Sequence, residues 1–568
     1  MKKLLLLFLP VLILAQSYRF KKVAGGFPIS GYSGPTLLFD SNNDGHQDLT
    51  FPVIRDWQIW EYVSPNRFEL AYTGMGHWTE KWAIGDIDQD GLWDRLETGP
   101  DSLENDTNLI LTYESENPYS YPININWVYK IRSSEHTSWD AYYPGDLDGD
   151  GQREIFFTRS DTFLGLTIME NRGNNNNVTV WRGGYPIGPD GGPAKAFGDF
   201  DQDGRMEFVQ ATASWHNKVS VYENTGNDQY QLIFVDTITL PNGHFDAFSG
   251  NDVNQNGKPE FFINFFVLFG IRFYLYMWEA VGDNRYQRVC IDSTLSSYFE
   301  GGFLRSICAD IDADRVEEII QAAGTTIAVY KFINGEFRRI SLIYFGKPNC
   351  CLNSFDLNGN GYNEIIASGL ISGSLQRSTD IYELEVVWLL RPNRNETFRA
   401  GTQELIRWRI FQPPRCDSLS LFYSIDNGRN YYPIATGLPG TDTTYLWTVP
   451  YVRSDSCKVK VIAYGPGWQD DESDGVFRIT AVGMEEGYGQ KPPGRFEIYP
   501  NPASSHLAIR LLPTADRIRI YDVCGKLVQE ILKPNKNLIS LKGLTSGIYF
   551  LKIKTAEREI EKRLVILK

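Results

Sequence analysis

Residues Asp146 to Glu154 read DLDGDGQRE, and this nine-residue stretch decides the fold. Oxygen-bearing side chains stand at its positions 1, 3, 5 and 9, and a glycine stands at position 6. Calcium takes six to eight hard oxygen ligands, and a glycine allows the sharp turn that wraps a loop around the ion. The following residues, EIFFTR, are rich in β-branched and aromatic types and predict a strand. The stretch therefore predicts a calcium loop that leads into β structure.

The same pattern occurs seven times in the chain. Its copies begin at Asp40, Asp86, Asp146, Asp199, Asp252, Asp310 and Asp356, at intervals of 46 to 60 residues. Six of the seven copies lack the position-12 glutamate of an EF-hand, and strand-like sequence flanks them, so EF-hands and dockerins are excluded. One Asp-rich loop is equally well explained as a solvated turn. Seven copies with fixed ligand spacing instead predict calcium binding.

Each copy supplies five candidate ligand positions, and position 7 varies freely, as expected if only its backbone carbonyl binds. The candidate calcium ligands are Asp40, Asn42, Asp44, His46, Asp48, Asp86, Asp88, Asp90, Leu92, Asp94, Asp146, Asp148, Asp150, Gln152, Glu154, Asp199, Asp201, Asp203, Arg205, Glu207, Asp252, Asn254, Asn256, Lys258, Glu260, Asp310, Asp312, Asp314, Val316, Glu318, Asp356, Asn358, Asn360, Tyr362 and Glu364. The loops at Asp86, Asp146 and Asp199 have four carboxylates and the glycine, which predicts the tightest binding. The loops at Asp252 and Asp356 have two carboxylates each, which predicts weaker binding. The loop at Asp310 has Arg315 instead of glycine, which predicts a strained or empty site.

Each repeat resolves into four short strands, which is the content of one β-propeller blade. The last repeat lacks its fourth strand, and the segment YRFKKVAG, residues 18–25, is a spare strand of the right length. We expect it to pair into the last blade and close the ring, which leaves no exposed sheet edge. The repeats resemble the FG-GAP/VCBS repeats of integrin-α-like propellers. The resemblance implies a seven-bladed β-propeller over residues 16–385 that acts as an extracellular recognition or adhesion module.

Two small β domains are predicted after the repeats. Residues 386–481 alternate as strands do and resemble an Ig-like β-sandwich of secreted bacterial proteins, through Pro392, Asn393, Glu396, Gly401 and residues 447–450. Cys416 and Cys457 each precede a strand of this domain. Export to an oxidising environment would allow a disulfide between them, and the alternative of two free thiols stays open. Residues 482–495 are Gly/Pro-rich and polar, which predicts a linker.

Both ends of the chain predict export. Residues 1–15 contain two lysines, an apolar run and a final small residue, which predicts a cleaved signal peptide. Residues 496–568 contain, in order, Tyr499-Pro500-Asn501-Pro502, Tyr521-Asp522 and Gly547-Ile548-Tyr549. They resemble the C-terminal sorting domain of the type IX secretion system. The resemblance implies a small β-sandwich, recognition by that secretion machinery at the outer membrane, and a product that is secreted or attached to the cell surface.

Composition and motifs narrow the function. The formal charge of −15 argues against nucleic-acid binding, which needs a basic surface. The sequence has no G-x-S-x-G, HExxH, P-loop or CxxC motif. We therefore predict a secreted or cell-surface calcium-binding, non-catalytic module for recognition or adhesion to a polysaccharide or protein. Two alternatives remain open: a lyase-like polysaccharide-degrading enzyme on a calcium-rich propeller, and a passive structural protein of the envelope.

A second candidate site comes from histidines that stand beside aromatic residues. In a propeller, the loops from strand four to the next blade and from strand two to three lie on the face opposite the metal loops. The candidate ligand-binding residues predicted on that face are His77, Trp78, His136, Trp139, Trp215, His216 and His244, joined by Phe245 and Trp57. Such a rim binds glycans or peptides by stacking and hydrogen bonding. The alternative is that the aromatics pack between blades and the histidines are ordinary surface residues.

Overall fold

The computed structural model describes most of the chain after the predicted signal peptide, which lies outside the described residues. The described residues are 18–566 except 31–35, 54–55, 76–80, 101–106, 133–135, 161–165, 174, 184–195, 213–216, 242, 268–271, 298–303, 349, 372–375, 412–413, 481–496, 500, 502, 504–505, 511–514, 523–525, 533–537 and 556–558. All regular elements in this part of the chain are β-strands. None of these residues forms a helix that could span a membrane. The all-β class predicted from the sequence is confirmed.

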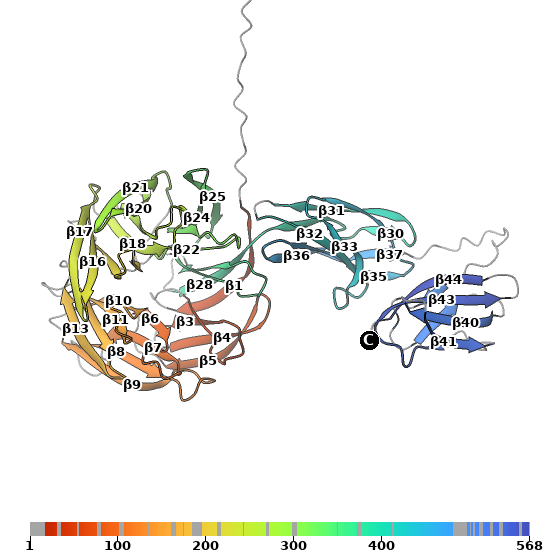
Figure 1. The fold of residues 1–568 in the computed structure, drawn as a ribbon, viewed down its shortest axis with the longest axis horizontal. Coiled ribbons are helices and arrows are strands. Elements are labelled where there is room, and N and C mark those ends of the chain that lie inside the picture. The colour runs from red at the N-terminus through yellow and green to blue at the C-terminus, as the bar shows by residue number, and fades with distance from the viewer. Residues whose placement is uncertain are drawn as a thin grey trace, which may run out of the picture. The chain divides into compact units, whose positions relative to one another are not determined.

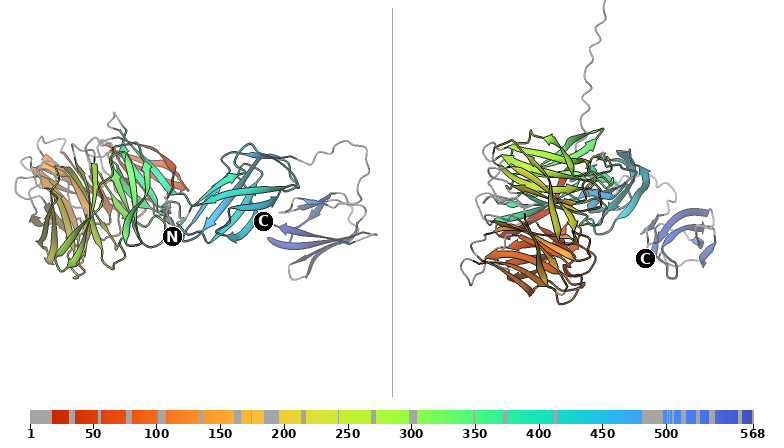
Figure 2. Two further views of the ribbon diagram at one scale, coloured as in Figure 1. Left: turned by 90° about the horizontal axis from the view of Figure 1, so that it is seen from above. Right: turned by 60° about the vertical axis from the view of Figure 1, so that its left-hand side comes forward.

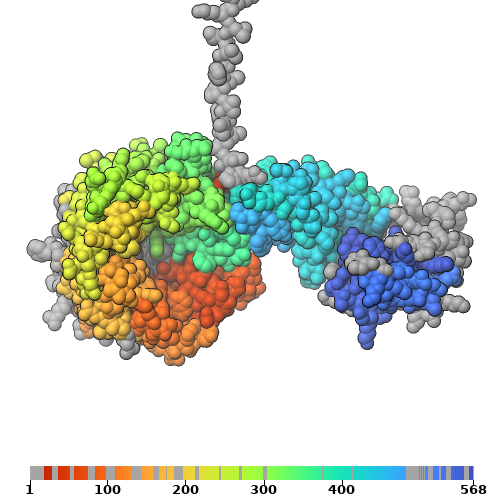
Figure 3. Space-filling model, in the orientation of Figure 1, coloured from red at the N-terminus to blue at the C-terminus, as the bar shows by residue number. Residues whose placement is uncertain are grey.

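The repeat region folds into seven four-stranded antiparallel sheets, here called sheets 1 to 7, which follow one another around a ring (Figure 1). Sheet 1 contains β2 (Leu37–Phe39), β3 (Asp48–Val53), β4 (Asp56–Ser64) and β5 (Arg67–Met75). Sheet 2 contains β6 (Lys81–Gly85), β7 (Asp94–Pro100), β8 (Thr107–Glu114) and β9 (Asn124–Arg132). Sheet 3 contains β10 (His136–Gly145), β11 (Arg153–Ser160), β12 (Leu166–Asn171) and β13 (Asn177–Gly183). Sheet 4 contains β14 (Ala196–Gly198), β15 (Glu207–Thr212), β16 (Lys218–Gly226) and β17 (Gln229–Thr237). Sheet 5 contains β18 (Gly243–Gly250), β19 (Glu260–Val267), β20 (Arg272–Gly282) and β21 (Arg285–Asp292). Sheet 6 contains β22 (Ile307–Ala309), β23 (Glu318–Ala323), β24 (Thr326–Ile333) and β25 (Glu336–Tyr344). The space-filling view shows these segments succeeding one another around the ring in chain order (Figure 3).

Sheet 7 is completed by the N-terminal segment of the chain. It contains β26 (Cys351–Phe355), β27 (Glu364–Leu370), β28 (Gln376–Leu384) and β1 (Phe20–Ser30). β1 lies antiparallel to β28, from Phe20 opposite Leu384 to Ser30 opposite Gln376. The predicted closure by residues 18–25 is therefore confirmed, and the edge of β28 is covered.

Neighbouring sheets are held together by shared apolar cores. Between sheets 3 and 4, for example, Phe156 lies edge-to-face against Phe208 with ring centroids 5.1 Å apart. The innermost strands β2, β6, β10, β14, β18 and β22 line a cavity of about 380 Å³, to which Tyr143 and Arg305 contribute. The dense packing between neighbouring sheets fixes each sheet relative to the next and holds the loops between strands in place.

A pair of packed sheets follows the ring within the same compact unit, residues 1–482, which Figure 2 shows from two further directions. One sheet contains β29 (Val387–Arg391), β31 (Gln403–Ile410) and β34 (Thr444–Thr448); the other contains β30 (Thr397–Arg399), β37 (Phe477–Thr480), β35 (Ser454–Tyr464), β32 (Ser418–Ser424), β33 (Tyr432–Pro439) and β36 (Trp468–Glu472). Trp408 and Trp447 lie in the shared core. The predicted disulfide is wrong: Cys416 and Cys457 are buried free thiols, and each Sγ donates a hydrogen bond to a carbonyl of its own segment.

The second compact unit, residues 483–568, has two small sheets around one core. The first contains β38 (Glu497–Tyr499), β39 (His506–Arg510) and β42 (Leu538–Ser540), and the second contains β41 (Leu527–Leu532), β40 (Ala515–Asp522), β43 (Gly547–Thr555) and β44 (Glu559–Ile566). Leu507, Ile518 and Leu551 are fully buried between them. The predicted linker 482–495 lies outside the described residues.

Candidate metal-binding loops

The seven acidic stretches, here called loops 1 to 7 in chain order, each connect the first and second strands of one sheet. In every loop a carboxylate oxygen of position 1 accepts the backbone N–H of position 6 at 2.8–3.1 Å. The side-chain oxygen of position 5 accepts the N–H of position 7 at 2.8–2.9 Å. One backbone path is therefore common to all seven loops, including loop 6, where Arg315 adopts the left-handed φ of +73°.

The position-9 carboxylate anchors each loop to the start of its second strand. Its exposed fraction is at most 1% in all seven loops. One of its oxygens accepts the N–H of position 2 at 2.5–3.0 Å. Whether the other oxygen has a hydrogen-bond donor differs between loops, and this difference distinguishes the loops chemically.

Loops 3 and 4 gather four carboxylates and leave some of their oxygens without a hydrogen-bond donor. The oxygens of Asp146, Asp148, Asp150 and Glu154 lie within 4.8 Å of one another, and so do those of Asp199, Asp201, Asp203 and Glu207. Glu154 Oε1, Glu207 Oε1 and Asp199 Oδ1 are buried and have no hydrogen-bond partner. A buried carboxylate oxygen without a donor is costly. Both loops therefore fit a hard divalent cation, whose charge and coordination would remove that cost.

Burial also shifts the proton affinity of these carboxyl groups. It raises the pKa of Glu154 to about 8 and that of Glu207 to about 9, and the neighbouring aspartates add to the effect. Burial likewise raises the pKa of Glu260 to about 7 and that of Asp94 to about 7. Without a cation these groups hold a proton near neutral pH; a bound cation favours the ionised form.

Loop 2 resembles loops 3 and 4 but its fourth carboxylate stands apart. Oxygens of Asp86, Asp88 and Asp90 lie within 4.8 Å of one another. Asp94 accepts the N–H of Ile87 at 2.8 Å and faces the Asn126 amide at 3.5 Å. Three converging carboxylates make loop 2 a candidate for the same chemistry.

The next sheet in the ring supports each of these three loops. The turn between its third and fourth strands donates a backbone N–H to the position-3 carboxylate. Asn175 donates to Asp88 at 3.0 Å, Asp228 to Asp148 at 2.8 Å, and Asn284 to Asp201 at 2.7 Å. These residues have φ values of +57° to +59°, which Asn and Asp tolerate better than other side chains. The loops thus lie at the seams between sheets, and a cation there would clamp two sheets at once.

Loops 1, 5 and 7 differ because amide groups replace some of their carboxylates. In loop 7, Asn358 Nδ2 donates to Glu364 at 2.6 Å and Asn360 Nδ2 donates to Glu383 at 2.9 Å. In loop 5, Asn254 Nδ2 donates to Glu279 at 3.1 Å, while Glu260 Oε1 remains without a partner. In loop 1, both oxygens of Asp48 accept backbone N–H groups, those of Ser41 and Tyr62. Hydrogen-bond donors of the protein thus offset part of the negative charge of the carboxylates in these loops.

Most described side chains at position 7 point their polar atoms elsewhere, so only their carbonyls remain as ligand candidates. Gln152 donates to Asp150 at 3.0 Å, and Lys258 Nζ donates to the Ala280 carbonyl at 2.9 Å. His46 stacks on Tyr62 with ring centroids 4.3 Å apart. Arg205 lies 3.4 Å from Glu223, and Tyr362 is buried in the core of the two packed sheets that follow the ring. Leu92 and Val316 have no polar side-chain atom.

The register of the sheets reveals a further acidic position that the sequence analysis missed. Opposite the position-9 carboxylate, on the third strand, stands a glutamate in six of the seven sheets. The pairs are Asp94 with Glu114, Glu154 with Glu170 and Glu207 with Glu223, and the register extends to Asp48 with Glu61, Glu260 with Glu279 and Glu364 with Glu383. In sheet 6 the corresponding residue is Lys331. The intervals between partners range from 13 to 20 residues, which hides the pattern in the sequence.

The predicted histidine–aromatic face is only partly within the described residues. His77, Trp78, Trp215 and His216 lie outside them, and for His136, Trp139 and His244 only the strand backbone is described. Trp57 does not belong to such a face: its exposed fraction is 1%, and the Arg95 guanidinium lies 4.0 Å from its ring centroid. Phe245 is also a packing residue, 4.7 Å from the Phe265 ring. For these two aromatics, packing inside the ring is the correct interpretation.

Comparison with known families places two segments of the chain. Residues 497–567 match the model of the secretion system C-terminal sorting domain. The chain carries a type IX secretion sorting domain, and the protein is therefore secreted or displayed at the cell surface. Residues 146–210, which contain loops 3 and 4, match the FG-GAP-like repeat.

Similarity to whole proteins is distant. No curated protein matches the chain. Among solved structures, the SapL1 lectin in complex with alpha methyl fucoside shares 8% identity at a TM-score of 0.33, covering 55% of this chain and 95% of the lectin. The exo-beta-1,3-galactanase of Phanerochaete chrysosporium shares 9% identity at 0.29, covering 78% of this chain and 95% of the enzyme. The V. cholerae biofilm matrix protein Bap1 shares 13% identity at 0.27, covering 96% and 81% of the two chains. At these values the similarity carries no inference about the activity of this protein.

Proposed function

We propose that the protein is an exported, calcium-clamped recognition or adhesion module for a polysaccharide or protein. In this proposal the seven sheets are the blades of a β-propeller, and the two sheets of residues 386–481 are an Ig-like spacer. The sorting domain delivers the protein through the type IX machinery to the exterior of the outer membrane. The ring then presents loops to the surroundings on a rigid frame.

The observation that carries the calcium part of the proposal is the set of unpartnered oxygens in loops 3 and 4. Glu154 Oε1, Glu207 Oε1 and Asp199 Oδ1 are buried among other carboxylates and lack donors. Calcium bound by positions 1, 3, 5 and 9, together with the position-7 carbonyl, would neutralise that charge. Each such ion would also strengthen one seam between blades, because position 3 already accepts an N–H from the next blade.

Calcium stoichiometry tests this part directly. The protein is freed of metal with a chelator, and bound calcium per chain is measured by equilibrium dialysis. We expect Glu154→Gln and Glu207→Gln each to lower the number of bound ions by one. As a matched control, Glu116→Gln changes an exposed glutamate near loop 2 and should leave the number unchanged. Equal stoichiometry in all four proteins would contradict the assignment.

The recognition part is tested on glycan and protein arrays with and without chelator. Binding that needs calcium and is lost in Trp78→Ala or Trp139→Ala, with unchanged thermal stability, supports the histidine–aromatic rim as the binding face. Turnover of uronate polymers, seen as new ultraviolet absorbance, would instead support the polysaccharide-degrading alternative. Absence of both would favour a passive structural role.

A further inference from the structure

Loop 6 departs from the other loops in charge. On the third strand of sheet 6, Lys331 occupies the position that holds a glutamate in the other six sheets. Lys331 is 8% exposed, so its ammonium group lies inside the protein. An isolated buried ammonium is unfavourable and requires carboxylate partners.

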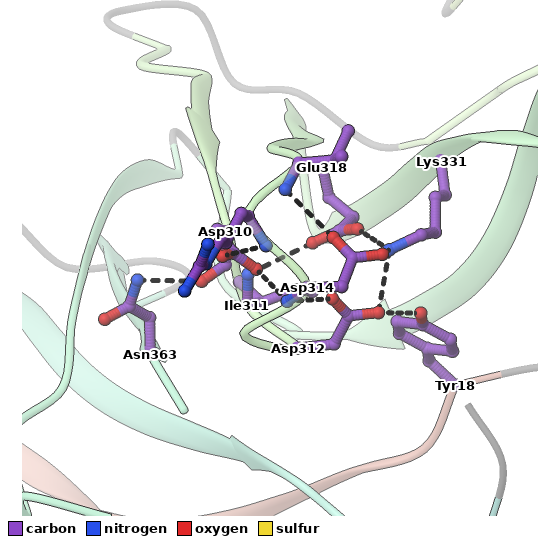
Figure 4. Close-up of polar contacts among 10 residues, drawn as sticks. Tyr18, Asp310, Ile311, Asp312, Asp314, Glu318, Lys331 and Asn363 are labelled. Atoms are coloured by element: carbon purple, nitrogen blue, oxygen red, sulfur yellow. Dashed lines mark hydrogen bonds and ion pairs between the residues drawn. The ribbon is translucent and has the colours of Figure 1, made fainter. Parts of the chain in front are cut away.

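The ammonium of Lys331 lies among the loop's own carboxylates (Figure 4). Its Nζ is 2.7 Å from Asp312 Oδ2 and 2.8 Å from Asp314 Oδ2, and it also contacts Glu318 Oε1. Three carboxylate oxygens around Nζ stabilise the protonated ammonium, because a buried charge is favourable only beside opposite charges.

Every oxygen of the four carboxylates at the ligand positions of loop 6 already has a donor. Asp310 accepts the N–H groups of Asp314 and Arg315, and Glu318 accepts the N–H of Ile311 and the Lys331 ammonium. The remaining four oxygens are satisfied in the same way: Asp312 by Asp314 N–H, Tyr18 O–H and Lys331, and Asp314 by Val316 N–H and Lys331. In loops 3 and 4, by contrast, three carboxylate oxygens have no donor. Oxygens of Asp310, Asp312 and Glu318 lie within 4.8 Å of one another, as metal ligands would, but the Lys331 ammonium already contacts two of these three carboxylates. The hydrogen-bonding capacity of these carboxylates is therefore met without a metal ion.

Loop 6 also lies where the ring closes. In loops 2 to 4 the position-3 carboxylate accepts an N–H from the outer turn of the next sheet. Sheet 7 has no such turn, because its outer strand is β1 from the other end of the chain. Tyr18, next to β1, donates its hydroxyl to Asp312 instead, and its N–H bonds to the Ile340 carbonyl at 3.0 Å. Asn363 of loop 7 donates to the Asp310 carbonyl at 2.8 Å, and Ala313 packs against the sandwich core.

We propose that Lys331 is a resident cation that takes the place of calcium in loop 6, and that it keeps the closing seam of the ring locked when calcium is absent. The proposal rests on calcium binding by the other loops for the contrast between seams, but not for the Lys331 clamp itself. Loss of calcium would then loosen the seams at loops 2 to 4 while Tyr18, β1 and sheets 6 and 7 stay joined. The ring would open at the seams of loops 2 to 4 and would close again with β1 still paired to β28.

Calcium stoichiometry provides the first test. We expect Glu318→Gln to bind as many ions as the wild type, although Glu207→Gln, at the same position of loop 4, binds one fewer. The double variant Lys331→Glu/Arg315→Gly restores the acidic pattern and the glycine, and we expect it to bind one ion more. One ion fewer in Glu318→Gln, or no gain in the folded double variant, would overturn the proposal.

Hydrogen exchange in the presence of chelator provides the second test. In the wild type we expect chelation to speed exchange in loops 3 and 4 while amides of β1 and β23 keep their protection. Lys331→Met should abolish that protection, whereas Lys258→Met, which removes a lysine from loop 5, should preserve it. Equal exposure of β1 and loops 3 and 4 in chelated wild type would refute the clamp. If no protein binds calcium, the proposed function fails, but Lys331→Met still decides whether the clamp exists.

Discussion

At the scale of single residues, the partner of one buried oxygen distinguishes loop 6 from loops 3 and 4. Loops 3, 4 and 6 share backbone path, carboxylate count and burial, yet only loop 6 has Lys331 beside its position-9 carboxylate. A buried cluster of ionised carboxylates needs positive charge, which either a metal ion or an ammonium group supplies. Equivalent loops can therefore differ in chemistry through one residue outside the loop.

Arg315 gives a residue-scale prediction. Its φ of +73° is left-handed, a conformation that costs a non-glycine residue about 1 kcal/mol. We expect Arg315→Gly to raise the free energy of unfolding by about 1 kcal/mol, measured by urea denaturation. Gly257→Ala is the matched reverse change, because Gly257 has φ +92° and a Cβ added there would meet no other atom within 4 Å, and it should destabilise by a similar amount. A destabilising Arg315→Gly would show that the arginine side chain stabilises the loop more than its backbone strains it.

The raised carboxyl pKa values give a pH prediction for the metal-free protein. Glu154 and Glu207 bind a proton more tightly in the folded chain, with pKa values of about 8 and about 9, than in the unfolded chain. A raised carboxyl pKa stabilises the fold at low pH, and this contribution is lost as pH rises from about 4.5 towards 9. In chelator we therefore expect the melting temperature to fall between pH 5 and pH 9.

Calcium should reverse this trend, because it competes with protons for the same oxygens. With saturating calcium the melting temperature should rise as the pH rises from 5. Glu207→Gln in chelator should show a weaker fall than the wild type, since one titrating group is gone. A pH profile identical with and without calcium would contradict the assignment of these carboxylates as ligands.

At the scale of elements, sequence reasoning succeeded where the information is local. The loops, the strands around them and the closing strand follow from spacing and alternation within short stretches, as for Asp146 to Glu154. Lys331 was missed because its partner Glu318 is 13 residues away across a hairpin, and only strand register brings them together. The Cys416–Cys457 pairing failed for a related reason: position before a strand does not state which way a thiol points.

The closing strand provides the element-scale prediction. β1 pairs with β28 along its length, and Lys22 lies 2.7 Å from Asp380. Removal of residues 16–30 would expose the edge of β28, and exposed edges recruit other strands. We expect this truncated protein to self-associate in light scattering after size-exclusion chromatography, whereas a protein that begins at residue 16 stays in the wild-type state. Addition of a peptide of residues 18–30 should restore that state; a truncated protein with unchanged size would show that β28 needs no cover.

At the scale of the whole molecule, calcium should act on one compact unit and spare the other. All seven loops belong to residues 1–482, and the sorting domain belongs to residues 483–568. Calcium at 100 times its dissociation constant adds about 2.7 kcal/mol per independent site, provided that the unfolded chain does not bind it. With sites in loops 2, 3 and 4, chelation should markedly lower the melting temperature of the first unit in differential scanning calorimetry. The transition of the second unit should not move.

The double variant Glu154→Gln/Glu207→Gln separates specific binding from general effects of the chelator. Its first transition should start lower in calcium and shift less on chelation, because two of the three sites have lost a ligand. Replacement of Glu318 by Gln should leave the calcium-dependent shift at its wild-type size, since Lys331 already supplies the cation in loop 6. A chelator shift as large in the double variant as in the wild type would mean that calcium stabilises the ring through other groups than these loops.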